Sequence, residues 1–133
     1  MIKNFSEWNE QKIKTELRDS KKIKCKKREI WMCLIGENLG SEISKGKPFL
    51  RPVLILNNYL GGDLVSAIPA TTKHKKHFDH FFFQLSHPRI KRKSWIMLNQ
   101  VRVISKKRLI RDLHARISKK QFQCIKKRLQ ELT

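Results

Sequence analysis

The sequence predicts an α+β domain that is mainly β: a small antiparallel barrel or sandwich with one helix before it and one behind it. In the middle of the chain, short runs rich in β-branched and aromatic residues alternate with Gly, Asn, Pro and Ser. This pattern is typical of small all-β folds. Both ends of the chain carry apolar residues at helical spacing instead. At 133 residues the chain is about one domain long.

The first element expected is a helix over residues 4–19. Ser6 can cap its start. The residues that give it a loose apolar face are Phe5, Trp8, Ile13 and Leu17. The basic run 20–27 that follows is interpreted as a linker. The chain is therefore divided into a helical extension with its linker, residues 1–25, and a barrel domain, residues 26–133.

Five segments of the central region have the composition of strands. They are residues 29–34, 52–56, 64–68, 80–85 and 95–103. Turn-forming residues separate them, which favours antiparallel neighbours joined by short connections.

The C-terminal segment predicts a second helix that begins after Ser118. Ser118 precedes Gln121 by three residues, the spacing of a capping box, and Ile117 and Phe122 hold the two positions of a hydrophobic staple. The apolar residues that share one face of this helix are Phe122, Ile125, Leu129 and Leu132. We expect this face to pack on the sheet.

The charge of the chain indicates its class of partner. Lys and Arg number 31 against 11 Asp and Glu, a formal net charge of +20. The excess is spread along the whole chain, whereas a small acidic substrate would need only one basic pocket. Such a charge attracts polyanions. We therefore expect nucleic acid, or an acidic protein that covers the same surface.

Cysteine usage and hydropathy predict a cytoplasmic protein without a cofactor. Cys25, Cys33 and Cys124 are odd in number and far apart, which fits unpaired thiols in a reducing compartment. The histidines are not spaced with them as zinc ligands, so no metal site is expected. No apolar run approaches the ~18 residues of a membrane span, and the start lacks the apolar stretch of a signal peptide.

Four blocks of sequence, taken in order, resemble the PemK/MazF family of toxin ribonucleases. They are residues 28–31 (REIW), the pair 40–42 (GSE) and 51–57 (RPVLILN), residues 68–73 (IPATTK), and residues 99–104 (NQVRVI) with 107–109 (KRL). Each block alone is an ordinary strand sequence, but four in the family's order make chance a poor explanation. The resemblance runs from about residue 28 to residue 132.

The resemblance implies a fold, an activity and partners. The fold is a small SH3-like antiparallel β-barrel with a C-terminal packing helix. The activity is that of the toxin of a type II toxin–antitoxin system: a metal-independent endoribonuclease that cleaves single-stranded RNA (mRNA). Attack by the 2′-OH would leave 2′,3′-cyclic phosphate and 5′-OH ends. The implied partners are single-stranded RNA, an acidic cognate antitoxin and a second copy of the chain in a homodimer.

The resemblance also implies site residues, with Arg51 and Thr71 at the catalytic positions. The guanidinium fork of Arg51 suits a bidentate grip on phosphate oxygens, and the Thr71 hydroxyl can donate one more hydrogen bond to them. Ser41 and Glu42 are expected to support or orient this pair. The residues expected to contact RNA are Lys45, Lys47, Lys73, Lys75, Lys76, Gln100 and Arg102.

The sequence leaves the proton carrier open. Arginine is essentially always protonated and is an awkward base. His74, His77 and His80 follow Thr71 closely and have side chains suited to proton transfer. Glu42 is a further candidate. A basic loop in which these histidines merely touch phosphate explains the same residues.

Two other functions and several purely structural roles fit parts of the sequence. A non-catalytic RNA- or DNA-binding module on the same barrel would explain the charge, and so would a toxin of similar fold that acts on DNA gyrase. Arg51 could be a solvated strand start, and Thr71 an ordinary turn residue. Trp31 and Trp95 are more typical of core or interface than of base stacking.

Overall fold

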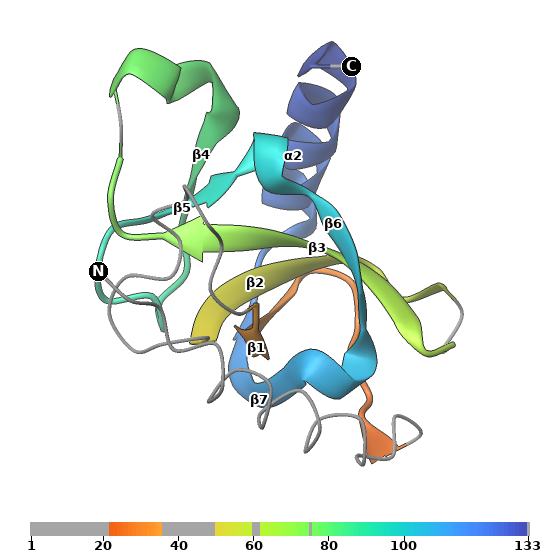
Figure 1. Cartoon of the computed structure of the whole chain (residues 1–133). Helices are drawn as coiled ribbons and strands as arrows, with labels where there is room; N and C mark the ends of the chain where they lie inside the picture. Colours follow the sequence, from red (N-terminus) through yellow and green to blue (C-terminus); the bar gives the residue numbers. More distant parts are fainter. Residues whose placement is uncertain (1–21, 36–49, 60–61, 75, 133) are drawn as a thin grey trace, which may run out of the picture.

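The computed structural model describes residues 22–35, 50–59, 62–74 and 76–132. These residues form a seven-stranded sheet, short 3₁₀ segments and a C-terminal α-helix (Figure 1). The strands are β1 (Glu29–Leu34), β2 (Leu50–Asn57), β3 (Leu64–Thr71), β4 (Phe82–Leu85), β5 (Ser94–Met97), β6 (Arg102–Ser105) and β7 (Leu109–Arg116). The other elements are η3 (Lys76–Phe81), η4 (Leu98–Gln100), η5 (Lys106–Arg108) and α2 (Lys119–Leu132). The expected helix over residues 4–19 lies outside the described residues.

The sheet is antiparallel throughout, in the order β4-β5-β3-β2-β1-β7. Strand β3 is its centre. One edge of β3 pairs with β2, while the other edge pairs first with β6, from Leu64 to Ala67, and then with β5, at Ala70 and Thr71. The prediction of a mainly β antiparallel fold with a C-terminal helix is confirmed.

Apolar residues fill both faces of the sheet and form two clusters. We call the first the inner cluster; its main members are Ile23, Cys25, Trp31, Cys33, Val53, Ile55, Val65, Ala67, Met97, Ile104 and Leu109. We call the second the helix-side cluster; its main members are Ile30, Leu54, Ile68, Ala70, Leu85, Ile96, Ala115, Ile117, Phe122 and Ile125. Along β2, Val53 and Ile55 belong to the inner cluster and Leu54 to the other, because successive strand residues point to opposite faces.

Helix α2 covers the second face, as its apolar positions predict. The Ser118 hydroxyl accepts a hydrogen bond from the Gln121 backbone N–H at 3.1 Å, so the expected cap is confirmed. The side chain of Gln121 bonds across to Ser86, accepting from its N–H at 2.9 Å and donating to its carbonyl at 3.0 Å. Ile117 and Phe122 are both buried in the helix-side cluster. The helix start is therefore fixed to the sheet and to the loop before β5.

The run interpreted as a basic linker contributes to the core. Ile23 and Cys25 are buried in the inner cluster, while Lys22, Lys24 and Lys26 are exposed. This alternation is the period of two expected for an extended segment with one buried face. The packed unit therefore begins before the predicted boundary at residue 26.

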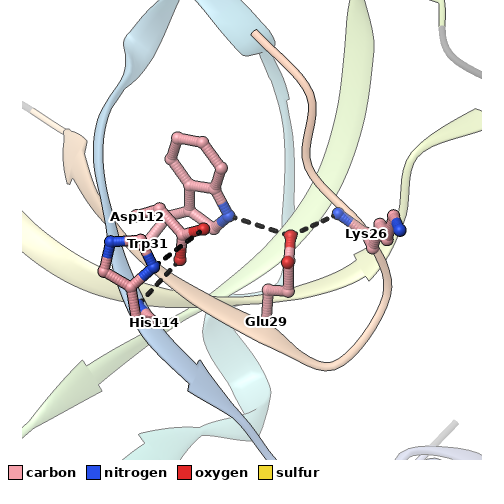
Figure 2. Close-up of polar contacts among 5 residues, drawn as sticks. All are labelled: Lys26, Glu29, Trp31, Asp112 and His114. Atoms are coloured by element: carbon pink, nitrogen blue, oxygen red, sulfur yellow. Dashed lines mark hydrogen bonds and ion pairs between the residues drawn. The ribbon is translucent and has the colours of Figure 1, made fainter.

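Strand β7 was missed because a bulge breaks its alternation. Ile30 of β1 pairs with Ala115, but the next residue, Trp31, pairs with Asp112, so two residues of β7 have no counterpart. His114, one of the two, has a positive φ of 56°, which His tolerates better than most residues. Its backbone N–H donates to Asp112 Oδ1 at 2.8 Å (Figure 2).

Beside this bulge, a carboxylate fixes the indole of Trp31. Glu29 Oε1 accepts hydrogen bonds from the Lys26 backbone N–H at 2.6 Å and from Trp31 Nε1 at 3.2 Å (Figure 2). Trp31 is buried in the inner cluster with its indole N–H satisfied. The structural interpretation of Trp31 is thus confirmed.

Two other predicted strands differ from the observed ones. The segment 95–103 divides at η4 into β5 and β6, because both halves pair with the same edge of β3 at different points. The segment 80–85 is extended only from Phe82, since η3 occupies the residues before it. Arg128 of α2 donates to the His80 carbonyl at 2.8 Å and ties that 3₁₀ segment to the helix.

The three cysteines are free thiols with different expected reactivity. Burial raises the pKa of Cys25 and raises that of Cys33 to about 12, whereas Cys124 on α2 is exposed. A thiol reacts as its thiolate, so at pH 8 a disulfide reagent is expected to titrate one thiol per folded chain. All three should react in denaturant. Rapid labelling of Cys33 under native conditions would contradict the packing of the inner cluster.

Candidate active site

Arg51 and Thr71 lie on neighbouring strands near one end of the sheet. Strands β2 and β3 are in register with Val53 opposite Pro69 and Leu54 opposite Ile68. The pairing of β2 with β3 runs no further toward this end: Arg51, near the start of β2, pairs with Cys33 of β1, and Thr71, the last residue of β3, pairs with Trp95 of β5. Because strand residues alternate between faces, Arg51 shares the face of Val53 and Thr71 shares the face of Pro69, so both side chains belong to the same face of the sheet.

We give the name Arg51–Thr71 row to these two residues together with their partners on the neighbouring strands. Cys33 of β1 pairs with Arg51, Thr71 pairs with Trp95 of β5, and Trp95 pairs with Gln84 of β4. Cys33 is a member of the inner cluster, so the row lies on that face of the sheet.

The guanidinium of Arg51 is partly withdrawn from water. Its residue is half-buried, and burial lowers its pKa below the ordinary value. A guanidinium that has lost part of its hydration interacts more strongly with an anion than one in bulk water. Arg51 thus lies near the start of β2 and is only partly solvated.

Two further arginines act on the Cys33 end of the row. Burial is the main influence on the Cys33 thiol, and the positive charges of Arg108 and Arg102 oppose the rise in its pKa. Cys33 is the strand partner of Arg51, so the charges of Arg108 and Arg102 act on the strand position next to Arg51. Sequence reasoning named Arg51 and Arg102 but missed Arg108, whose position depends on the path of the chain through η5.

The Thr71 hydroxyl has a defined orientation. Its Oγ1 accepts a hydrogen bond from the Lys73 backbone N–H at 3.1 Å. This is the local turn contact that the structural interpretation expected. It also leaves the hydroxyl as a donor, since an oxygen that accepts one hydrogen bond can still donate its proton. The turn contact and a contact with phosphate are therefore compatible.

A histidine follows Thr71 and is held by three side chains. The ring of His74 stacks on Trp95 with centroids 5.0 Å apart and planes 14° apart, and it meets the Phe82 ring at 5.3 Å. His74 Nε2 lies 2.6 Å from Asp79 Oδ1. Sequence reasoning named His74 but missed Asp79, and it placed Trp95 in the core or an interface rather than beside Thr71.

The other predicted RNA-contacting residues are only partly described. Lys73 and Lys76 are exposed near the Thr71 end of β3, while Gln100 and Arg102 are half-buried on the β5–β6 side. The predicted residues that lie outside the described part are Ser41, Glu42, Lys45, Lys47 and Lys75.

A second basic feature lies on the helix side of the sheet. A hollow of about 300 Å³ is lined by Phe122 and Gln123 of α2 together with five cationic residues. Those five are Lys27, Arg28, Arg116, Lys119 and Lys126. Arg28 Nη1 donates to the Ile117 carbonyl at 3.1 Å, and Arg116 Nε donates to the Lys27 carbonyl at 3.2 Å. Positive charge thus gathers on both faces of the sheet.

Within the described residues, no three or more His, Cys, Asp or Glu side chains are grouped so that they could hold a metal ion. In the same part of the chain, no helix is long and apolar enough to cross a membrane.

Comparison with protein families identifies the chain's relatives. Residues 26–133 match the model of the PemK-like, MazF-like toxins of type II toxin–antitoxin systems. The chain belongs to this family. The match covers the whole sheet and α2, and includes both Arg51 and Thr71. A search of curated proteins found no match.

Solved structures of similar fold include toxin–antitoxin complexes. An endoribonuclease in complex with its cognate antitoxin from Mycobacterial species is 15% identical, covers 81% of this chain and 93% of its own, and gives a TM-score of 0.59. Two crystal forms of MazE–MazF from Deinococcus radiodurans, forms II and III, are 15% and 16% identical. They cover 81% of this chain and 93% and 94% of theirs, with TM-scores of 0.56 and 0.57. At these identities the likeness shows the fold.

Proposed function

We propose that this chain is the toxin of a type II toxin–antitoxin pair and a metal-independent endoribonuclease that cleaves single-stranded RNA. The observation that carries the proposal is that Arg51 and Thr71 belong to the neighbouring strands β2 and β3, on the same face of the sheet and near the same end. Membership of the family and the net charge of +20 support it.

The chemistry proposed for the site is attack of the RNA's own 2′-OH on the adjacent phosphorus. As the new O–P bond forms, negative charge grows on the non-bridging oxygens. The Arg51 fork and the Thr71 hydroxyl are donors suited to those oxygens, and donors that bind more strongly in the transition state than in the ground state accelerate the step. Breakage of the bond to the 5′ oxygen leaves a 2′,3′-cyclic phosphate and a 5′-OH end.

Basic and polar side chains around the row are proposed to hold the RNA backbone. Lys73, Lys76, Gln100 and Arg102 are the described members of this set. Ser41 and Glu42 are proposed to support the catalytic pair, and Lys45, Lys47 and Lys75 to extend the contacts. Contacts of this kind supply affinity that falls steeply with salt and is indifferent to sequence.

An acidic antitoxin and a second copy of the chain are the proposed protein partners, in the cytoplasm. The charge of the chain favours an acidic partner. For the homodimer, the supporting observation is exposed apolar surface on β3 and β6: Leu64 is 50% exposed and Val103 is 55% exposed. We also propose that the described sheet forms the SH3-like barrel that the resemblance implies, with β3 pairing on both edges.

The test is incubation of the purified protein with a defined single-stranded RNA in buffer containing EDTA. We expect cleavage, with product ends that carry 2′,3′-cyclic phosphate and 5′-OH. Loss of cleavage in EDTA that Mg²⁺ restores would contradict the metal-independent mechanism. RNA that is bound in a salt-dependent manner but left intact would instead indicate the non-catalytic binding module.

A further inference from the structure

We propose that His74 is the general acid of the cleavage reaction: it protonates the 5′ oxygen as the bond between that oxygen and phosphorus breaks. Asp79 is its positioning residue. This inference rests on the proposed function and names the proton carrier that the sequence left open.

The sheet brings the imidazole of His74 to the Arg51–Thr71 row. Thr71 and Trp95 are direct partners in the pairing of β3 with β5. His74 follows Thr71 by three residues, and its ring lies nearly parallel to that of Trp95 at 5.0 Å between centroids. The imidazole is therefore beside the strand position of the hydroxyl that is proposed to bind the phosphate.

Contacts from three elements fix the ring in one orientation. Trp95 of β5 stacks on it, Phe82 of β4 packs against it at a tilt, and Asp79 of η3 contacts Nε2 at 2.6 Å. Because Asp79 occupies Nε2, Nδ1 is the nitrogen left to exchange a proton with a substrate. The His74 side chain is 26% exposed, so it is enclosed by its neighbours and still reachable.

The groups that surround the His74 ring are suited to a proton donor. The residues that pack on it from β4 and β5 are uncharged, and the one facing it from η3 is the carboxylate of Asp79. A carboxylate holds an imidazole in one tautomer and compensates its charge when protonated, as the aspartate does in catalytic triads.

The other two histidines of this loop lack such a setting. The ring of His80 packs on Phe81 at 3.9 Å, and its backbone carbonyl is bound by Arg128 of α2. His77 is exposed, and no hydrogen bond or ring contact of its side chain occurs within the described residues. Of the three, His74 alone combines a carboxylate partner with a place beside Thr71.

The step balances without any other reagent. The 2′ oxygen forms a bond to phosphorus and gives its proton to solvent water. The electron pair of the bond between phosphorus and the 5′ oxygen stays on that oxygen, which takes the proton from His74 Nδ1. The neutral His74 then regains a proton from water, so the net reaction is a transesterification with no change of oxidation state.

The test uses a substrate whose leaving group needs no general acid. In RNA with sulfur in place of the 5′ bridging oxygen at the cleavage site, the leaving group is a thiolate that needs no proton. His74→Ala is expected to lower single-turnover cleavage of ordinary RNA by about 10²-fold, yet to cleave the sulfur substrate within a few-fold of wild type. An equal loss on both substrates would overturn the proposal.

Three variants complete the experiment. Asp79→Asn is expected to show a smaller loss on ordinary RNA, also recovered with the sulfur substrate, because it acts through His74. His77→Ala, the matched control, should cleave both substrates like wild type. Arg51→Ala should be impaired on both, since phosphate binding is needed whatever the leaving group. If wild type cleaved neither substrate, the proposed function itself would fail, whereas an unrescued His74→Ala beside an active wild type defeats only the general acid.

Discussion

Arg51→Ala is expected to lower kcat/KM for RNA cleavage by about 10³-fold, a loss of about 4 kcal/mol of transition-state stabilisation. Arg51 lies on the strand beside that of Thr71, and its guanidinium is partly withdrawn from water, where its hydrogen bonds to a phosphate are strongest. RNA binding should weaken much less, because Arg51 is one cation among 31 Lys and Arg residues. Single-turnover cleavage and a binding titration at fixed salt measure the two effects separately.

Controls for this variant come from the same strand pair and from the surface. Arg51→Lys keeps the charge but loses the planar fork, so it should remain strongly impaired. Thr71→Val should cost less than Arg51→Ala, and the double variant less than the sum of both, because the two side chains are proposed to bind one phosphate. Arg111→Ala, an exposed arginine on β7, should cleave normally. Cleavage by Arg51→Ala at the wild-type rate would refute the proposed site.

Local signals in the sequence were sufficient for several elements. Strand β1 spans the predicted residues 29–34, and α2 begins directly after the predicted cap, Ser118. In both cases the signal lies within a few residues of the element: alternation in the strand, and a hydroxyl followed by a staple in the helix. The burial of Ile23 had a similar local signal, an alternation of Lys with apolar residues. It was not recognised because the many lysines of this run favoured its interpretation as a linker.

The remaining elements depend on contacts between residues that are far apart in the sequence. Strand β7 pairs with β1 through a bulge at His114, which breaks the alternation that identifies a strand. The break between β5 and β6 at η4 follows from their sharing one edge of β3. These are tertiary constraints, and they override local propensity.

The candidate site likewise contains residues that the sequence identified and residues that only the structure revealed. Arg51 and Thr71 were proposed from the resemblance, and they lie on the paired strands β2 and β3. Asp79 was missed because its interaction with His74 depends on the fold of η3. Arg108 was missed because its charge acts on Cys33, which lies on a strand far away in the sequence. Sequence blocks can name the residues of a site, but the partners that orient them come from the packing.

Leu54→Ala is expected to destabilise the domain strongly. Leu54 is fully buried at the centre of β2, and its strand partners are Ile30 of β1 and Ile68 of β3. All three belong to the helix-side cluster, together with Phe122 and Ile125 of α2. Truncation removes buried methyl groups and leaves a cavity between the sheet and the helix, at a cost of about 2–5 kcal/mol.

That cost is large for this chain because its charge already opposes compaction. A domain has about 5–15 kcal/mol of stability, and a net charge of +20 adds self-repulsion that salt relieves. Urea unfolding of Leu54→Ala, followed by circular dichroism, should therefore show a lower midpoint than that of wild type at an unchanged m-value. At low ionic strength, where self-repulsion leaves less total stability, the same loss of free energy removes a larger share of it. Ile110→Ala, at an exposed position on β7, is the control and should change the free energy of unfolding by no more than about 0.5 kcal/mol. If the two variants lost equal stability, Leu54 could not be packed between the sheet and α2.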